Sequence, residues 1–298
     1  YNTVVGDEAG TAITTGDSNV GVGKSALSSN TTASNNTAVG KDALGANTTG
    51  EASTALGSLA LDANTTGGFN TALGVHALGG NTSASYNTAV GWSCLKANTT
   101  GAENTAVGYA ALDANTTGDS NVAIGFGALT TNTTADNNTA VGRSALGANT
   151  TGTKNMASGT YSLDANTTGV QNTGLGYFSL SGNTTANNNT AVGFNTLASN
   201  TTGINNVAVG STALDANTTA DHNTAVGTGA LSADTLGQAN VAIGSGALQT
   251  QNFTSSTDSY NVGIGRLAGG AITTGVQNTL IGGLAGDAIT TGGSNTAL

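Results

Sequence analysis

Few residues in this sequence could do chemistry, and their spacing keeps them apart. The two histidines, His76 and His222, are far apart and fall at different positions of a 17-residue repeat, so a His-based catalytic or metal cluster is not expected within one chain. Cys94 is the only cysteine, so no disulfide can form within the chain. With no histidine beside it to activate the thiol, we expect Cys94 to be a small apolar filler. The sequence predicts no enzyme activity, no cofactor and no metal site.

The carboxylates are equally dispersed. Four aspartates recur 51 residues apart, which is too dilute for general acid/base pairing and favours a solvated corner: Asp62, Asp113, Asp164 and Asp215. Three other acidic segments lack the glycine spacing of calcium-binding β-rolls, at Asp17, Asp119 and Asp136. Six Lys and Arg against 16 Asp and Glu also exclude a surface that follows phosphates, so nucleic acid is not an expected partner.

The chain is one repeat from end to end, and its consensus is N-T-A-V-G-x-x-A-L-x-A-N-T-T-G-x-x. We number the repeat from its Asn as position 1; the fifth position is Gly in every complete repeat. Regular coils cover 2–239, a coil with four extra residues covers 240–260, and C-terminal coils cover 261–298. A repeat this short and strict predicts a solenoid in a single array, with the insertion as a loop that leaves one coil.

The residue types predict an all-β, parallel β-solenoid (β-roll or β-helix) of about 18 coils. The sequence has 46 Gly and no Pro, and Val, Ile and Thr fill the first motif without any helical rhythm. We expect T-A-V to be a strand with positions 2 and 4 inward and position 3 outward, Gly at position 5 to turn at positive φ, and A-L-x-A to be a second short strand with its Leu inward. Because three repeats form a 51-residue unit, an intertwined triple β-helix is the alternative.

A solenoid this thin buries little apolar surface, so we expect it to associate with itself. The predicted contact is the outward column of small residues at position 3, in a homotrimer or a fibril bundle. The sequence begins and ends within the repeat, which predicts either an excerpt of a longer array or copies that stack end to end. No apolar run is long enough to insert into a membrane.

Two repeat positions form columns of side chains that could be glycosylated or could contact another molecule. The N-x-[ST] pattern recurs in twelve consecutive repeats, and each Asn is a candidate glycan acceptor or a structural corner residue: Asn30, Asn47, Asn64, Asn81, Asn98, Asn115, Asn132, Asn149, Asn166, Asn183, Asn200 and Asn217. Ile at this position in three other repeats indicates that it points inward. Aromatic residues at position 6 form a candidate contact strip or packing seam: Trp92, Tyr109, Phe126, Tyr177 and Phe194.

These strings resemble two known families. N-T-A-V-G and N-V-A-I-G are similar to the head repeats of trimeric autotransporter adhesins, in which such a motif marks each coil of a trimeric, left-handed β-roll. The segment from Asn104 to Gly118 is more similar still to the arrays of bacterial and phage tail-fibre-like proteins. The resemblance covers essentially the whole chain, and it implies a surface or virion fibre.

The sequence therefore predicts a non-catalytic structural segment of an extracellular, cell-surface or virion fibre whose main partner is itself. One alternative is an adhesin-type module that binds glycans or cell surfaces through the aromatic strip. A further alternative is an ice-binding protein that uses Asn and Thr at positions 12 and 14 as a flat face.

Overall fold

The computed structural model describes residues 1–298 and contains no helix. Two compact units, 1–151 and 152–298, are each described by themselves. The first unit contains β1 (Thr3–Val5), β2 (Val20–Val22), β3 (Thr37–Val39), β4 (Thr54–Leu56), β5 (Thr71–Leu73), β6 (Thr88–Val90), β7 (Thr105–Val107), β8 (Val122–Ile124) and β9 (Thr139–Val141). The second contains β10 (Met156–Ser158), β11 (Thr173–Leu175), β12 (Thr190–Val192), β13 (Val207–Val209), β14 (Thr224–Val226), β15 (Gly237–Gln238), β16 (Val241–Ile243), β17 (Thr257–Asp258), β18 (Val262–Ile264), β19 (Thr279–Ile281) and β20 (Thr296–Ala297).

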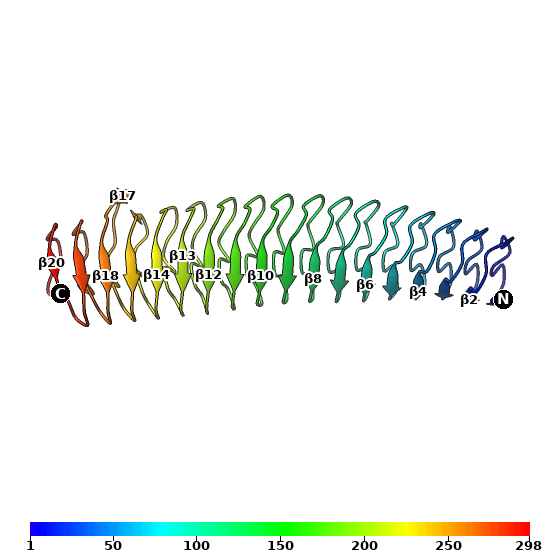
Figure 1. Cartoon of the computed structure of the whole chain (residues 1–298), viewed down its shortest axis with the longest axis horizontal. Helices are drawn as coiled ribbons and strands as arrows, with labels where there is room; N and C mark the ends of the chain where they lie inside the picture. The colour runs from blue at the N-terminus through cyan, green and yellow to red at the C-terminus, as the bar shows by residue number, and fades with distance from the viewer. The chain divides into compact units, whose positions relative to one another are not determined.

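Within each unit the T-x-V strands pair in parallel with the strand of the next repeat. Thr54 pairs with Thr71 and Ala191 pairs with Ala208, so the offset is one repeat in both units. The arrows of neighbouring coils lie side by side in Figure 1. Each 17-residue repeat is thus one complete coil of a parallel β-solenoid, as predicted. The alternative of an intertwined triple β-helix is wrong, because each strand pairs with the next repeat of its own chain.

The strands face the opposite way from the prediction. Position 3 points inward and is fully buried, as at Ala72 and Ala106, whereas positions 2 and 4 face outward. The cause is the narrow interior. A Cβ at Gly21, which occupies position 3, would lie 3.3 Å from the Leu27 side chain on the opposite wall, so this wall has room for little more than a methyl group. The small-residue column therefore cannot be the contact between copies.

The A-L-x-A segment is not a strand. Positions 7 and 9 are left-handed instead, for example Ser25 and Leu27 with φ of 55° and 56°. Backbone hydrogen bonds still join adjacent coils in this segment. The N–H of Ser25 donates to the Asp7 carbonyl of the preceding coil, and the N–H of Leu27 donates to the Ala43 carbonyl of the next coil. The Leu side chains are completely buried, as predicted. Their burial offsets a left-handed backbone that costs about 1–2 kcal/mol per residue.

Positions 3, 9 and 12 share one core volume. Most coils combine Ala, Leu and Asn at these positions, but two combine a larger position 3 with Gly and Ile: Val4, Gly10 and Ile13, and Leu280, Gly286 and Ile289. A Cβ at Gly286 would lie 2.7 Å from a Leu280 methyl and 3.1 Å from the Ile289 Cδ1. The Ile residues at position 12 therefore fill the space left by the missing Leu.

The four-residue insertion forms a surface loop, as predicted. Thr254, Ser255 and Ser256 are exposed, and β17 pairs with β15. The main sheet keeps its alignment across the loop, because Val241 pairs with Val262. The four extra residues lie between position 14 of one coil and position 1 of the next.

We expect Gly74→Ala, at position 5, to lower the free energy of unfolding by at least ~2 kcal/mol in urea denaturation. Gly74 has φ of 137°, and a Cβ there would collide with the Gly91 carbonyl of the next coil. Gly79→Ala in the same coil is the control, since its Cβ would meet only atoms at 3.2 Å or more. Equal stability of the two variants would contradict this account of position 5.

A double-mutant cycle tests the shared core volume. Leu61→Gly should destabilise the chain by about 2–5 kcal/mol through its cavity. Asn64→Ile should cost about 1–3 kcal/mol because buried polar atoms lose their partners. The double variant recreates the Gly and Ile combination, so we expect its loss to be smaller than the sum by at least ~1 kcal/mol. Additive losses in urea unfolding would show that the two positions do not share space.

Candidate interaction surfaces

Neither unit has a pocket in its surface. Nowhere in the chain do three or more His, Cys, Asp or Glu side chains gather as metal ligands. His76 lies in the first unit and His222 in the second. Cys94 is buried at position 8, where its thiol donates to the Gly108 carbonyl and burial raises its pKa. This is the apolar filler that was predicted. No segment forms a helix of membrane-spanning length and hydropathy.

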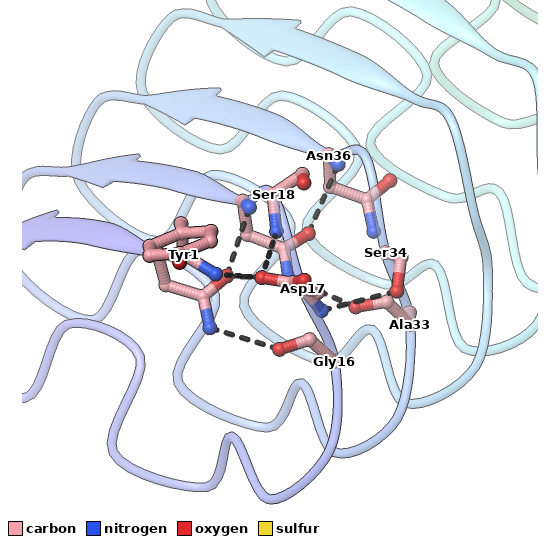
Figure 2. A network of polar contacts seen from close by, with 9 residues as sticks. Tyr1, Gly16, Asp17, Ser18, Ala33, Ser34 and Asn36 are labelled. Atoms are coloured by element: carbon pink, nitrogen blue, oxygen red, sulfur yellow. Dashed lines mark hydrogen bonds and ion pairs between the residues drawn. The ribbon is translucent and has the colours of Figure 1, made fainter.

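The Asn at position 1 binds each coil to itself and to the next. In the coil of Asn36, Nδ2 donates to the Gly50 carbonyl at 2.8 Å, near the end of the same coil, while Oδ1 accepts the backbone N–H of Ser53 in the next coil at 2.9 Å. Figure 2 shows an earlier stretch of this ladder, in which dashed lines lead to the carbonyls of Gly16 and Ala33. The side chains are buried. Their role is structural.

The twelve candidate glycan acceptors are fully buried at position 12 and form a second ladder. Nδ2 of Asn47 donates to Oδ1 of Asn30 at 3.0 Å and to the Gly50 carbonyl at 2.9 Å. A sugar on such a nitrogen would displace the ladder, so the folded coil offers no acceptor here. Because position 12 is interior, it also cannot form the flat face that the ice-binding hypothesis placed at positions 12 and 14.

The aspartates serve the solenoid as well. Asp119 and Asp136 accept backbone N–H groups of the preceding coils at 2.7 and 2.8 Å, through Oδ1 in each case. The four aspartates that recur every 51 residues are half-buried rather than fully solvated. Desolvation raises the pKa of three of them, Asp62, Asp164 and Asp215.

The aromatic strip lies on the surface and is stacked. The ring centroids of Trp92 and Tyr109 are 4.8 Å apart and those of Tyr109 and Phe126 are 4.9 Å apart, at interplanar angles of 13° and 7°. The Arg143 guanidinium lies 5.8 Å from the Phe126 centroid. Both faces of the Tyr109 ring are therefore covered by neighbouring rings, and the three side chains remain exposed to solvent. In the second unit Tyr177 and Phe194 stack in the same way, at 5.7 Å.

Two further stacks were missed in the sequence. Phe69 and Tyr86 at position 17 stack at 5.2 Å, and Tyr161 and Phe178 at position 7 stack at 5.1 Å. The signal was present, because each pair occupies one repeat position in consecutive coils.

Neither the protein-family models nor the curated proteins include a match to this chain.

Asp234 interrupts the second ladder with a buried carboxyl group. It is 1% exposed and takes position 12 after Asn217, whose buried Oδ1 has no partner. Its own oxygens accept the Gly237 N–H at 2.9 Å and Gln251 Nε2 at 2.6 Å. Desolvation raises the pKa of the Asp234 carboxyl above its ordinary value.

We expect Asp234 to favour the folded state most at low pH. Its folded pKa is raised, so the stabilisation is complete below the ordinary value near 4 and is lost as pH rises through the folded pKa. Asp234→Asn should restore the ladder, stabilise the chain at pH 7 and flatten the pH profile of the thermal midpoint. Asp258→Asn, on the exposed loop, is the control. If Asp234→Asn behaves like that control at every pH, the ionisation has no such role.

Proposed function

We propose that this chain is a non-catalytic structural segment of an extracellular, cell-surface or virion fibre. The observation that carries the proposal is the continuous parallel strand pairing between coils within each unit. Parallel strand pairing, the two Asn ladders and hydroxyl bonds from Thr at position 13 all run from coil to coil, for example from Thr48 to Thr65. A chain built in this way spans distance, and its surface has no pocket for a small substrate.

End-to-end assembly would continue the same contacts. Each coil offers the next a strand edge and an Oδ1 acceptor, as Asn104 does for the N–H of Asn121 at 2.9 Å. Nothing in the repeat itself terminates this ladder. A second copy in register could accept it, which is why open strand edges favour pairing.

Side-by-side association would use the position-6 ridge, which consists of Trp92, Tyr109 and Phe126. The three side chains are 47%, 48% and 54% exposed, and they form an apolar stack with its edges toward solvent. Aromatic residues are enriched where proteins meet. The ridge replaces the position-3 column as the proposed lateral contact, because position 3 is inside the coil.

An adhesin-type surface that binds carbohydrate is the weaker proposal. Sugars stack on the open faces of aromatic rings, whereas both faces of Tyr109 are covered by Trp92 and Phe126. The ring edges that remain are better suited to packing against another chain.

Electron microscopy over a concentration series tests the fibre. We expect filaments that lengthen with concentration, and lateral bundles that separate when Tyr109→Glu places a charge in the ridge. Thr66→Glu, an exposed Thr away from the ridge, should leave bundles intact. Discrete monomers at every concentration would overturn the proposal, and unchanged bundles with Tyr109→Glu would overturn the assignment of the ridge.

The proposed fibre carries no sugar on its buried asparagines, so the intact mass of the chain should stay near 28.6 kDa.

A further inference from the structure

The outer face of the parallel sheet has no charged residue in any repeat. We define the sheet face as positions 2 and 4 of β3 to β7, where five consecutive threonines stand beside five consecutive aliphatic residues. The threonines are Thr37, Thr54, Thr71, Thr88 and Thr105. All ten side chains are half-buried or exposed, so the face is a surface.

The hydroxyl groups of this face are unused by the protein. Oγ1 of the five threonines forms no hydrogen bond within the chain. The threonines at position 13 differ: Oγ1 of Thr48 donates to the Thr65 carbonyl at 2.9 Å, and Oγ1 of Thr65 donates to Thr82 at 2.9 Å. One Thr column therefore supports the solenoid, while the other presents free hydroxyls beside methyl groups.

The backbone fixes these groups on a regular grid. Successive strands are ~4.8 Å apart, and positions 2 and 4 of one strand are ~6.7 Å apart. The pairing holds this grid in register, because Thr71 lies beside Thr88 and Leu73 beside Val90. An ice crystal also presents oxygen atoms at regular spacings in two directions. Methyl groups order the water around them, and free hydroxyls can bond to that water.

We propose that the sheet face binds ice. The area argues against a second copy as the occupant of the sheet face: its five strands at ~4.8 Å, each about 10 Å wide, give roughly 240 Å², well below the ~800 Å² that each partner of a stable protein pair buries. A dry protein contact would also bury unbonded Thr hydroxyls at a cost, whereas an ice surface supplies donors and acceptors at every layer. The activity is independent of fibre formation.

The test is thermal hysteresis and inhibition of ice recrystallisation by the full chain. We expect activity in the wild type and its loss in Thr71→Lys, which places a charged, flexible side chain at the centre of the sheet face. Thr66→Lys, at exposed position 14, should retain full activity. Circular dichroism and thermal melting check that both variants keep the fold. Thr71→Val, which removes one hydroxyl and keeps the shape, should retain more activity than Thr71→Lys.

Three results would overturn the assignment. The first is a wild type that shows neither hysteresis nor inhibition of recrystallisation. The second is a loss of activity in Thr66→Lys as large as that in Thr71→Lys, which would place the ice contact elsewhere. The third is an ice-inactive chain whose oligomeric state changes with Thr71→Lys in sedimentation, which would make the sheet face a contact between copies.

Discussion

Two asparagine side chains converge on one carbonyl in most coils, and the rest of the solenoid depends on this contact. The Gly50 carbonyl accepts Nδ2 of Asn36 and Nδ2 of Asn47, so positions 1, 12 and 15 are fixed against one another. A carbonyl oxygen has two lone pairs, and both are used. Because the two amides also form hydrogen bonds to neighbouring coils, the same side chains close these coils and stack them. The extra residues of the insertion lie between positions 14 and 1, where Gln251 replaces the Asn and reaches both Asp234 and Asn261.

Much of the fold could be predicted from repeat spacing, and the orientation of the strand could not. Spacing predicts the solenoid, Gly at position 5, the inward Leu and the insertion loop, because each follows from identical residues in register. A three-residue strand, however, does not reveal which face is inside. Large residues were expected inside, but the interior already holds Leu and two rows of amides, which leaves room for little more than Ala in most coils. The clue was the covariation of Val4 with Gly10 and of Leu280 with Gly286.

The left-handed segment escaped prediction for a different reason. Leu and Ser have no preference for positive φ, so A-L-x-A reads locally as a strand. The tertiary structure overrides that preference: at positions 7 and 9 the N–H groups bond to opposite neighbours, as at Ser25 and Leu27. Burial of Leu and bonding in both directions outweigh the local cost. The same limit applies to the candidate glycan sites. The position-12 asparagines have the local sequence of a glycan acceptor, but the tertiary structure buries them in the core.

The surface positions differ in what they tolerate, and that difference separates folding from function. Position 6 holds Trp92, Tyr109 and Phe126 but also Lys24 and Lys41 on adjacent coils, so charges in consecutive layers do not break the solenoid. Strand preference explains Thr and Val at positions 2 and 4, because β-branched residues suit a half-exposed sheet. It also accounts for the lack of charge there, because Asp, Glu and Lys are depleted in strands. The ice contact that we propose would add a constraint from outside the coil, whereas the constraints on the Asn and Leu columns come from the interior.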